Sequence, residues 1–185
     1  MTIVGISGSL RRGSYNTSVL RATAQVMPDS AQLRIETIAG IPLYDGDIDA
    51  SEGIPQPVAS LKEAVAAADG LLLVTPEYNN SLPGVFKNAI DWLSRPPADI
   101  PRIFGSKPVA LIGASPGGFG TILSQNAWLP VLRTLGADLW SEARLLVPRA
   151  QGVFDQSGAL MDAAIKDRLR DILHGFVAFA GSRKD

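Results

Sequence analysis

The chain has 185 residues, of which 46% are hydrophobic and 19% charged, with a net charge of −1. This composition is typical of a globular domain with a full core, and the near-zero charge excludes a field that attracts nucleic acid or an anionic membrane. Cysteine is absent and His174 is the one histidine, which excludes disulfides, thiolate metal sites, cysteine nucleophiles and multi-histidine metal sites. Any chemistry is therefore expected to come from a bound cofactor.

No apolar run approaches the roughly 20 residues of a membrane span, and the N-terminus has no signal-peptide pattern. We therefore expect a cytoplasmic protein without a membrane or nucleic-acid partner. The sequence contains no linker, repeat or low-complexity segment, which predicts a single domain over residues 1–185.

Strand-like and helix-like segments alternate along the chain. Apolar or alternating runs predict strands at residues 3–7, 33–38, 70–75, 108–113, 137–140 and 144–147. Apolar residues at helical spacing predict helices at residues 17–27, 58–68, 83–95, up to about 135, and 162–180, whereas residues 40–49 are predicted to be a solvated loop. This order predicts an α/β fold with a parallel sheet and helices on both faces.

Three loops that follow predicted strands carry unusual residues, namely Gly8–Asn16, Pro76–Pro83 and Ala114–Gly120. In parallel sheets of this kind, ligands bind beyond the carboxyl ends of the strands, where the strand order reverses. Each loop alone is a weak signal, because a helix cap, a rigid connection or a mobile turn has the same composition. Together they predict one site, because the fold brings these strand ends together.

The first loop, Gly8–Asn16, is typical of a phosphate site, because it joins a strand to a helix N-terminus whose N–H groups and dipole favour an anion. Ser9, Ser14 and Asn16 add donors, and Arg11 or Arg12 adds a guanidinium. The lysine of a triphosphate-binding loop is missing, as is the dinucleotide fingerprint. The loop therefore favours a terminal monophosphate, and a plain glycine turn is the alternative.

The other two loops suit a flat ligand. Prolines stiffen the second loop, where backbone donors and Asn79 can address ring heteroatoms and Tyr78 can lie against the ring or cover a second ligand. Glycines in Ser115–Gly120 leave room for a ring edge.

These residues carry a family resemblance. Gly8-Ser9-Leu10-Arg11 with Ser14 and Asn16, and Pro76-Glu77-Tyr78-Asn79 with Pro83-Gly84-x-x-Lys87-Asn88-Ala89-Ile90-Asp91-Trp92, resemble the NADPH-dependent FMN reductase family, which includes quinone, azo-dye and chromate reductases. The resemblance spans nearly the whole chain. It implies a flavodoxin-like three-layer sandwich whose five-stranded parallel sheet has the order 2-1-3-4-5, with FMN at the switch point between the first and third strands.

The resemblance also implies the site residues. The cofactor-binding set is Ser9, Leu10, Arg11, Ser14, Tyr15 and Asn16 in the phosphate loop, Pro76, Glu77, Tyr78 and Asn79 at the isoalloxazine ring, and Ser115, Gly117 and Gly118 beside its far edge. Tyr78 and Asn80 are expected to shape the substrate pocket. Many relatives have an aromatic residue at position 80 and a glycine at position 121, where this chain has Asn80 and Thr121. We expect Arg11 to face the phosphate, and Arg12 stays open.

The implied activity is an FMN-dependent NAD(P)H oxidoreductase. It passes a hydride from NAD(P)H through FMN to a quinone, free flavin, azo dye or chromate-like acceptor in a ping-pong sequence, with no catalytic side chain and no metal. The alternatives are a flavodoxin-type electron carrier without nicotinamide turnover, which a net charge of −1 disfavours, and a phosphate-ligand sensor.

The predicted helix at residues 83–95 carries a stripe of large apolar residues, and core packing is the usual explanation for such a stripe. The stripe is larger than a single sheet face should need: Val85, Phe86, Ile90, Trp92 and Leu93. Since the family's members are homodimers or homotetramers, we expect a homodimer or homotetramer that uses part of this surface.

Overall fold

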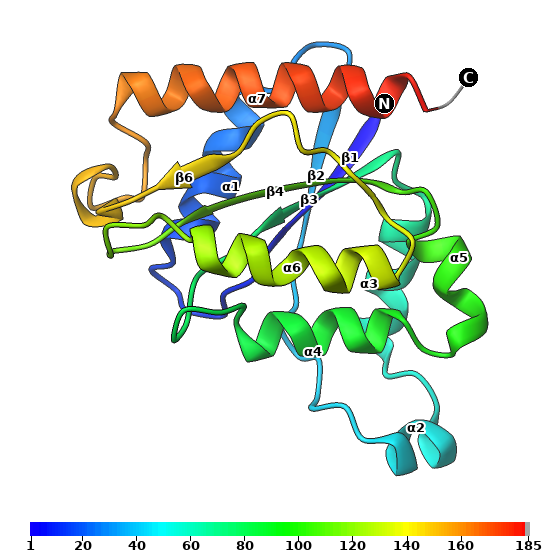
Figure 1. The fold of residues 1–185 in the computed structure, drawn as a ribbon. Coiled ribbons are helices and arrows are strands. Elements are labelled where there is room, and N and C mark those ends of the chain that lie inside the picture. Colours follow the sequence, from blue (N-terminus) through cyan, green and yellow to red (C-terminus); the bar gives the residue numbers. More distant parts are fainter. Residues whose placement is uncertain (184–185) are drawn as a thin grey trace.

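The computed structural model describes residues 1–183 and has a parallel sheet between two layers of helices (Figure 1). Its strands are β1 (Thr2–Ser7), β2 (Gln32–Glu36), β3 (Gly70–Val74), β4 (Pro108–Ala114), β5 (Asp138–Leu139) and β6 (Leu145–Val147). The order β2-β1-β3-β4-β5, with every pairing parallel, confirms the flavodoxin-like topology.

At the fifth position of the sheet, the two pieces predicted at residues 137–140 and 144–147 form two short strands, β5 and β6. β5 pairs with the start of β4 at Pro108 and Val109, whereas β6 pairs with its end, from Ile112 to Ala114. Residues 141–144, between β5 and β6, leave the sheet. Their side chains are exposed or half-buried, so pairing in the sheet would stabilise them little.

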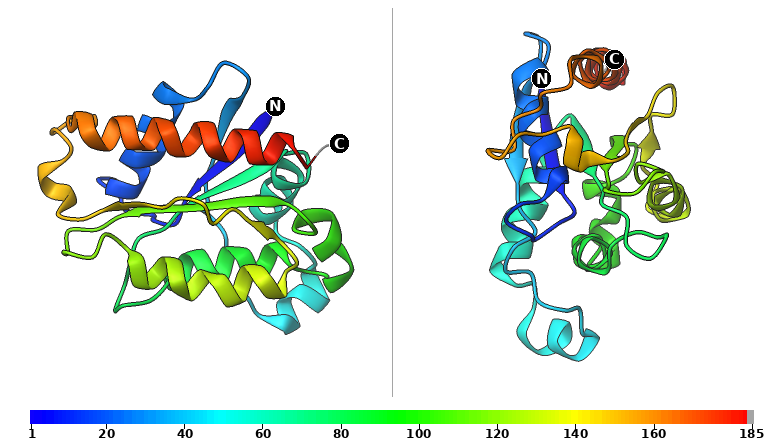
Figure 2. Two further views of the ribbon diagram at one scale, coloured as in Figure 1. Left: turned by 45° about the horizontal axis from the view of Figure 1, so that its top comes forward. Right: turned by 90° about the vertical axis from the view of Figure 1, so that its left-hand side faces the viewer.

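Helices cover both faces of the sheet, as Figure 2 shows from two further sides. They are α1 (Tyr15–Val26), α2 (Gly46–Glu52), α3 (Gln56–Ala66), α4 (Gly84–Leu93), α5 (Ile100–Ile103), α6 (Ile122–Thr134) and α7 (Ala163–Gly181), with 3-10 turns η1 (Pro97–Asp99) and η2 (Ala150–Gly152). α1 and α7 pack on one face, and α3, α4 and α6 pack on the other. β3 and β4 are therefore buried throughout, which explains their continuous apolar runs. No helix within residues 1–183 is long and apolar enough to cross a membrane.

The apolar stripe of α4 lies in the core of this chain. Phe86, Ile90, Trp92 and Leu93 are all buried by the sheet and by α6, and only Val85 keeps 38% of its surface exposed. The part of this stripe that one sheet face does not cover is therefore covered by other segments of the same chain. Apart from the exposed Val85, the stripe gives no support to a subunit interface.

The predicted loop at residues 40–49 runs into the short helix α2, which projects beyond α4 (Figures 1 and 2). Tyr44 anchors the segment, because its ring packs edge-on against Trp92 at 4.9 Å and its N–H donates to Asn88 Oδ1 at 2.8 Å. The prediction missed α2 because none of its residues is buried, so the sequence carries no apolar periodicity there.

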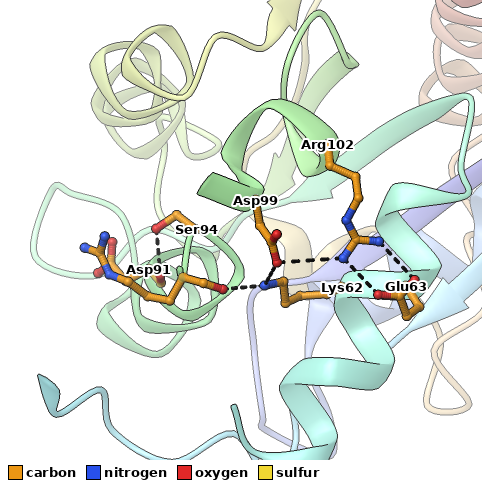
Figure 3. Close-up of polar contacts among 7 residues, drawn as sticks. Lys62, Glu63, Asp91, Ser94, Asp99 and Arg102 are labelled. Carbon is orange, nitrogen blue, oxygen red and sulfur yellow. Dashed lines mark hydrogen bonds and ion pairs between the residues drawn. The ribbon is translucent and has the colours of Figure 1, made fainter. Parts of the chain in front are cut away.

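An ion-pair cluster joins α3 to the segment that follows α4 (Figure 3). The nearly buried Lys62 ammonium donates to Asp99 Oδ2 at 2.6 Å and to the Arg95 carbonyl. Arg102 pairs with Glu63 through two hydrogen bonds of 2.9 and 3.0 Å. The hydrogen bond from Lys62 lowers the pKa of the Asp99 carboxyl below its ordinary value of 3.8. The cluster lies beyond the C-terminal end of α4, whereas the Pro76–Pro83 loop precedes its N-terminal end. Its role is therefore structural.

Candidate functional site

The three unusual loops meet at one edge of the sheet, because they follow β1, β3 and β4, which are neighbours in it. They enclose a cavity of about 230 Å³. Its lining residues are Ser9, Arg11, Ser14, Tyr15, Asn16, Pro76, Glu77, Tyr78, Ala114, Ser115 and Pro116. The structure thus brings together residues that lie more than 100 positions apart in the chain.

The first loop packs against α4. A Cβ at Gly8 would lie 2.2 Å from Phe86 Cδ1, so the phenyl ring occupies the space that any side chain at this position needs. The Gly8 N–H donates to the Val74 carbonyl at 2.9 Å, which ties the loop to the end of β3. Gly8 is therefore required by close packing beneath the loop.

The N-terminus of α1 presents free donors to the cavity. Helix α1 begins at Tyr15, two residues earlier than predicted, because the Ser14 side chain caps it by accepting from Thr17 N at 3.4 Å. The Ser18 N–H donates to the Ser14 carbonyl, and within residues 1–183 this leaves the N–H groups of Tyr15 and Asn16 without a protein acceptor. These donors, with the hydroxyl groups of Ser9 and Ser14, suit an anion.

Arg11 lines the cavity and Arg12 does not. The Arg11 guanidinium lies over the ring of Tyr15, 5.6 Å from its centroid, and its Nη2 donates to the Gly13 carbonyl at 2.7 Å. Both contacts are on the exposed surface, so a bound anion can compete for the same guanidinium.

Asn16 connects the first loop to the third. Its side chain is buried, its Nδ2 donates to the Ala114 carbonyl and its Oδ1 accepts from the Ala114 N–H, both at 2.9 Å. Asn16 therefore braces the cavity wall by pairing with the last residue of β4.

The second loop ends in a two-residue turn. Tyr78 and Ser81 exchange both backbone hydrogen bonds, and Asn79 and Asn80 between them have φ values of 50° and 60°. This is the left-handed geometry of a type I′ turn, which asparagine tolerates well. Asn79 and Asn80 are exposed and lie outside the cavity lining, whereas the half-exposed Tyr78 lies in it.

The backbone of the third loop is held by β6 and the segment after it, whereas the space beside Gly117 and Gly118 is open; the Gly117 carbonyl accepts from Arg149 N at 3.0 Å. Ser115 pairs with Val147 and Ala150 through backbone hydrogen bonds of 3.0 Å. At the centre, a Cβ at Gly118 would meet no atom within 4 Å, and one at Gly117 would meet only the Ser115 hydroxyl. In the protein without a ligand, neither close packing nor backbone strain requires glycine at positions 117 and 118. What these glycines contribute is open space beside the loop.

Leu10, Gly117 and Gly118 also lie outside the cavity lining, and Ala114 and Pro116 lie in it without having been predicted. Both missed residues flank Ser115, so extending the prediction along the chain by one residue in each direction would have included them.

The arrangement offers binding and orientation and has few groups for acid–base chemistry. Within residues 1–183, no group of three or more histidine, cysteine or acidic residues could hold a metal ion, and His174 is exposed on α7. Glu77 is the one ionisable carboxylate in the lining, and its side chain is turned to the start of α6. A cavity with free donors for an anion, at this switch point of a parallel sheet, is typical of a flavodoxin-like flavin-mononucleotide-binding protein.

The comparisons with known proteins give the family. The model of the NADPH-dependent FMN reductase family matches residues 1–152, and the chain belongs to this family. It is 42% identical to an NAD(P)H-dependent FMN reductase of Pseudomonas aeruginosa over 171 residues, which is 92% of this chain and 88% of that protein. It is 39% identical to a quinone reductase of Escherichia coli over 181 residues, covering 97% and 95% of the two chains.

Among solved structures, FerB, a flavoenzyme NAD(P)H:(acceptor) oxidoreductase from Paracoccus denitrificans, superposes with a TM-score of 0.87 at 29% identity. The match covers 98% of this chain and 97% of that one. The protein is therefore an oxidoreductase that works with FMN and NAD(P)H.

Proposed function

We propose that this enzyme transfers electrons from NAD(P)H through FMN to a quinone-type acceptor, in two half-reactions that use the same open face of the cavity. The observation that carries the proposal is the three-loop cavity, whose lining combines donors for an anion with Pro76, Tyr78 and Pro116 and contains no acid–base pair. The quinone reductases among its relatives support this class of acceptor.

In this proposal, the first loop binds the FMN phosphate. Ser9 and Ser14 donate through their hydroxyl groups, the first N–H groups of α1 add the helix dipole, and Arg11 adds a charge-assisted contact. The small number of cationic groups fits a single phosphate better than a triphosphate.

The second and third loops then orient the isoalloxazine ring. Pro76, Tyr78 and Pro116 line the cavity, and Gly117, Gly118 and Asn79, which follow these residues in the chain, are proposed to let a ring edge approach the backbone. When bound, FMN supplies the redox chemistry, accepting a hydride from NAD(P)H and passing two electrons to the acceptor. The chain contributes alignment of the reactants, for which no general acid or base is needed.

Tyr78 and Asn80 are proposed to shape the acceptor pocket, since both are exposed, Tyr78 lines the cavity and Asn80 lies in the same turn. The protein is proposed to be a homodimer or homotetramer. Exposed apolar side chains on the loops and helix starts around the cavity support this: Leu10, Tyr78, Val85, Phe119 and Leu123. Light scattering after size exclusion tests the assembly, and a monomer at micromolar concentration contradicts it. A cytoplasmic location stays a prediction.

The test of the function is a flavin titration followed by turnover. We expect the purified protein to bind one FMN per chain and then to oxidise NADPH or NADH in the presence of a quinone. A chain that binds FMN but does not oxidise either nucleotide is a flavodoxin-type carrier, and a chain that binds no FMN contradicts the proposal. Anaerobic stopped-flow reduction with each nucleotide defines the preferred donor.

A further inference from the structure

We propose that Glu77 is a positioning residue, whose carboxylate caps α6 and thereby holds the second and third loops at the spacing that the FMN ring needs. The inference rests on the proposed FMN site. It assigns to Glu77 a role toward the protein backbone in place of direct contact with the ring.

Helix α6 begins without a cap of its own. Its N-cap residue, Thr121, has a left-handed backbone with φ of 73°, and its side chain makes no capping hydrogen bond. The Thr121 hydroxyl instead accepts from Gln125 Nε2 at 3.2 Å, and both residues are buried. The Ile122 N–H donates to the Phe119 carbonyl at 3.3 Å, so the next N–H groups of α6, those of Leu123 and Ser124, depend on an acceptor from another part of the chain.

Glu77 supplies that acceptor from the second loop. Its Oε2 accepts from Leu123 N at 2.9 Å and from Ser124 N at 3.0 Å, across a sequence separation of about 46 residues. A carboxylate is the favoured group at this position, because the N-terminus of a helix carries partial positive charge and hydrogen bonds to a charged acceptor are stronger.

The contact sits beside a second, buried connection between the same two segments. The Thr75 hydroxyl lies 2.8 Å from the Ser124 hydroxyl and accepts from Trp128 Nε1 at 3.0 Å, and all three residues are fully buried. Thr75 and Glu77, the residues on either side of Pro76, are thus both hydrogen-bonded to α6. The first turn of α6 follows directly from the third loop in the chain.

Glu77 is only half-buried, and of the residues in these contacts it is the one that lines the cavity. The buried Thr75 contacts hold the base of the second loop, whereas Glu77 holds its outer part, next to Tyr78. Without the carboxylate, the loops can separate at the cavity mouth while the base stays fixed. If the competent arrangement then falls to about a tenth of the population, the apparent FMN affinity falls about tenfold.

The experiment compares three substitutions with a matched control in the full chain. Glu77→Ala removes the acceptor, Glu77→Asp keeps the charge but shortens the reach by one methylene, and Glu77→Gln keeps the acceptor oxygen without the charge. Asp162→Ala is the control, because Asp162 caps α7 through Ile165 N at 3.0 Å and does not line the cavity.

Two readouts are measured, the FMN dissociation constant by flavin fluorescence and the hydrogen exchange of the Leu123 and Ser124 amides without FMN. We expect Glu77→Ala and Glu77→Asp to bind FMN about tenfold more weakly and to lose protection at these amides. Glu77→Gln should stay within about threefold of wild type. Asp162→Ala should lose stability while keeping normal FMN affinity.

The inference is overturned if wild type and Glu77→Ala bind FMN with equal affinity. It is also overturned if Glu77→Gln binds FMN as weakly as Glu77→Ala while its Leu123 and Ser124 amides stay protected from exchange. The latter result identifies the charge itself as the determinant. If Glu77→Ala does not fold, the contrast between Glu77→Asp and Glu77→Gln decides the question. A wild-type chain that binds no FMN overturns the proposed function as well, so the two failures are distinguishable.

Discussion

Gly8→Ala tests whether the phosphate loop depends on the core beneath it. The added Cβ would lie 2.2, 2.8 and 2.9 Å from Cδ1, Cγ and Cε1 of Phe86. Non-bonded carbon atoms are most stable at about 3.5–4.0 Å, so the closest pair overlaps by roughly 1.3 Å or more. Gly8 has no positive φ, so alanine meets no backbone strain and the effect is steric.

The overlap cannot be relieved easily, because the neighbouring rings are fixed. Phe86 is fully buried and packs edge-on against Trp128, with ring centroids 5.1 Å apart. The Trp128 ring is in turn held by its hydrogen bond to Thr75. Overpacking of a dense core costs about 1–3 kcal/mol, and we expect Gly8→Ala to lie near the upper end at about 3 kcal/mol.

The assay is urea unfolding together with FMN titration, on Gly8→Ala, Phe86→Leu and the double variant. Gly8→Ala should lower the unfolding midpoint and weaken FMN binding, since the loop carrying Ser9 is displaced. Phe86→Leu alone should also destabilise, whereas the double variant should recover much of the alanine defect, because leucine vacates part of the ring's space. Strictly additive losses in the double variant refute the steric argument.

The remaining predictions concern the phosphate, the cavity wall and acid stability. Arg11→Ala should weaken FMN binding about tenfold, since a hydrogen bond to a charged group contributes about 1.5 kcal/mol, and Arg12→Ala should leave the affinity unchanged; equal effects contradict the assignment. Asn16→Ala should lower the free energy of unfolding by about 2 kcal/mol, measured in urea, because it leaves two buried backbone groups at the end of β4 unpaired. Lys62 lowers the pKa of the Asp99 carboxyl in the folded state below its ordinary value of 3.8. The stability that this pair contributes should therefore be present above pH 3.8 and be lost as the pH falls through the lower, folded-state pKa. Below that folded-state pKa, wild type and Asp99→Asn should have the same urea midpoint.

The strand order could be predicted because buried parallel strands have a strong sequence signature. β3 and β4 are continuous apolar runs, and the alternation with helices restricts the topology to few choices. The two strand pieces at the fifth position were predicted, but the part of β4 with which β5 and β6 each pair could not be, because the register depends on the folded sheet. α2 was missed for a related reason, since its only local signal is the Asp45 cap.

The stripe on α4 illustrates the limit of reading burial from one helix. The pattern of Phe86, Ile90, Trp92 and Leu93 indicates that these residues are buried, but it does not say by what. In the structure the sheet and α6 cover them, and Trp128 supplies the facing surface. A prediction of assembly from such a stripe needs the three-dimensional neighbours first.

The site was predictable at the level of loops and less so at the level of single atoms. Arg11 faces the cavity where Arg12 does not, whereas the role of Ser14 as the cap of α1 was not predicted. The hydrogen bonds between Asn16 and Ala114, however, join residues 98 positions apart, and no local sequence pattern predicts them. The same holds for the contact of Glu77 with α6.

These long-range contacts share one consequence. Each loop is fixed by a buried partner on another element: Gly8 rests on Phe86 of α4, Asn16 pairs with Ala114 of β4, and Thr75 bonds to Trp128 of α6. A cavity held in this way is ordered before its ligand arrives, which lowers the entropy that binding must overcome. It follows that FMN affinity should respond to substitutions in the aromatic core between α4 and α6, where no side chain faces the ligand, as strongly as to substitutions in the cavity lining.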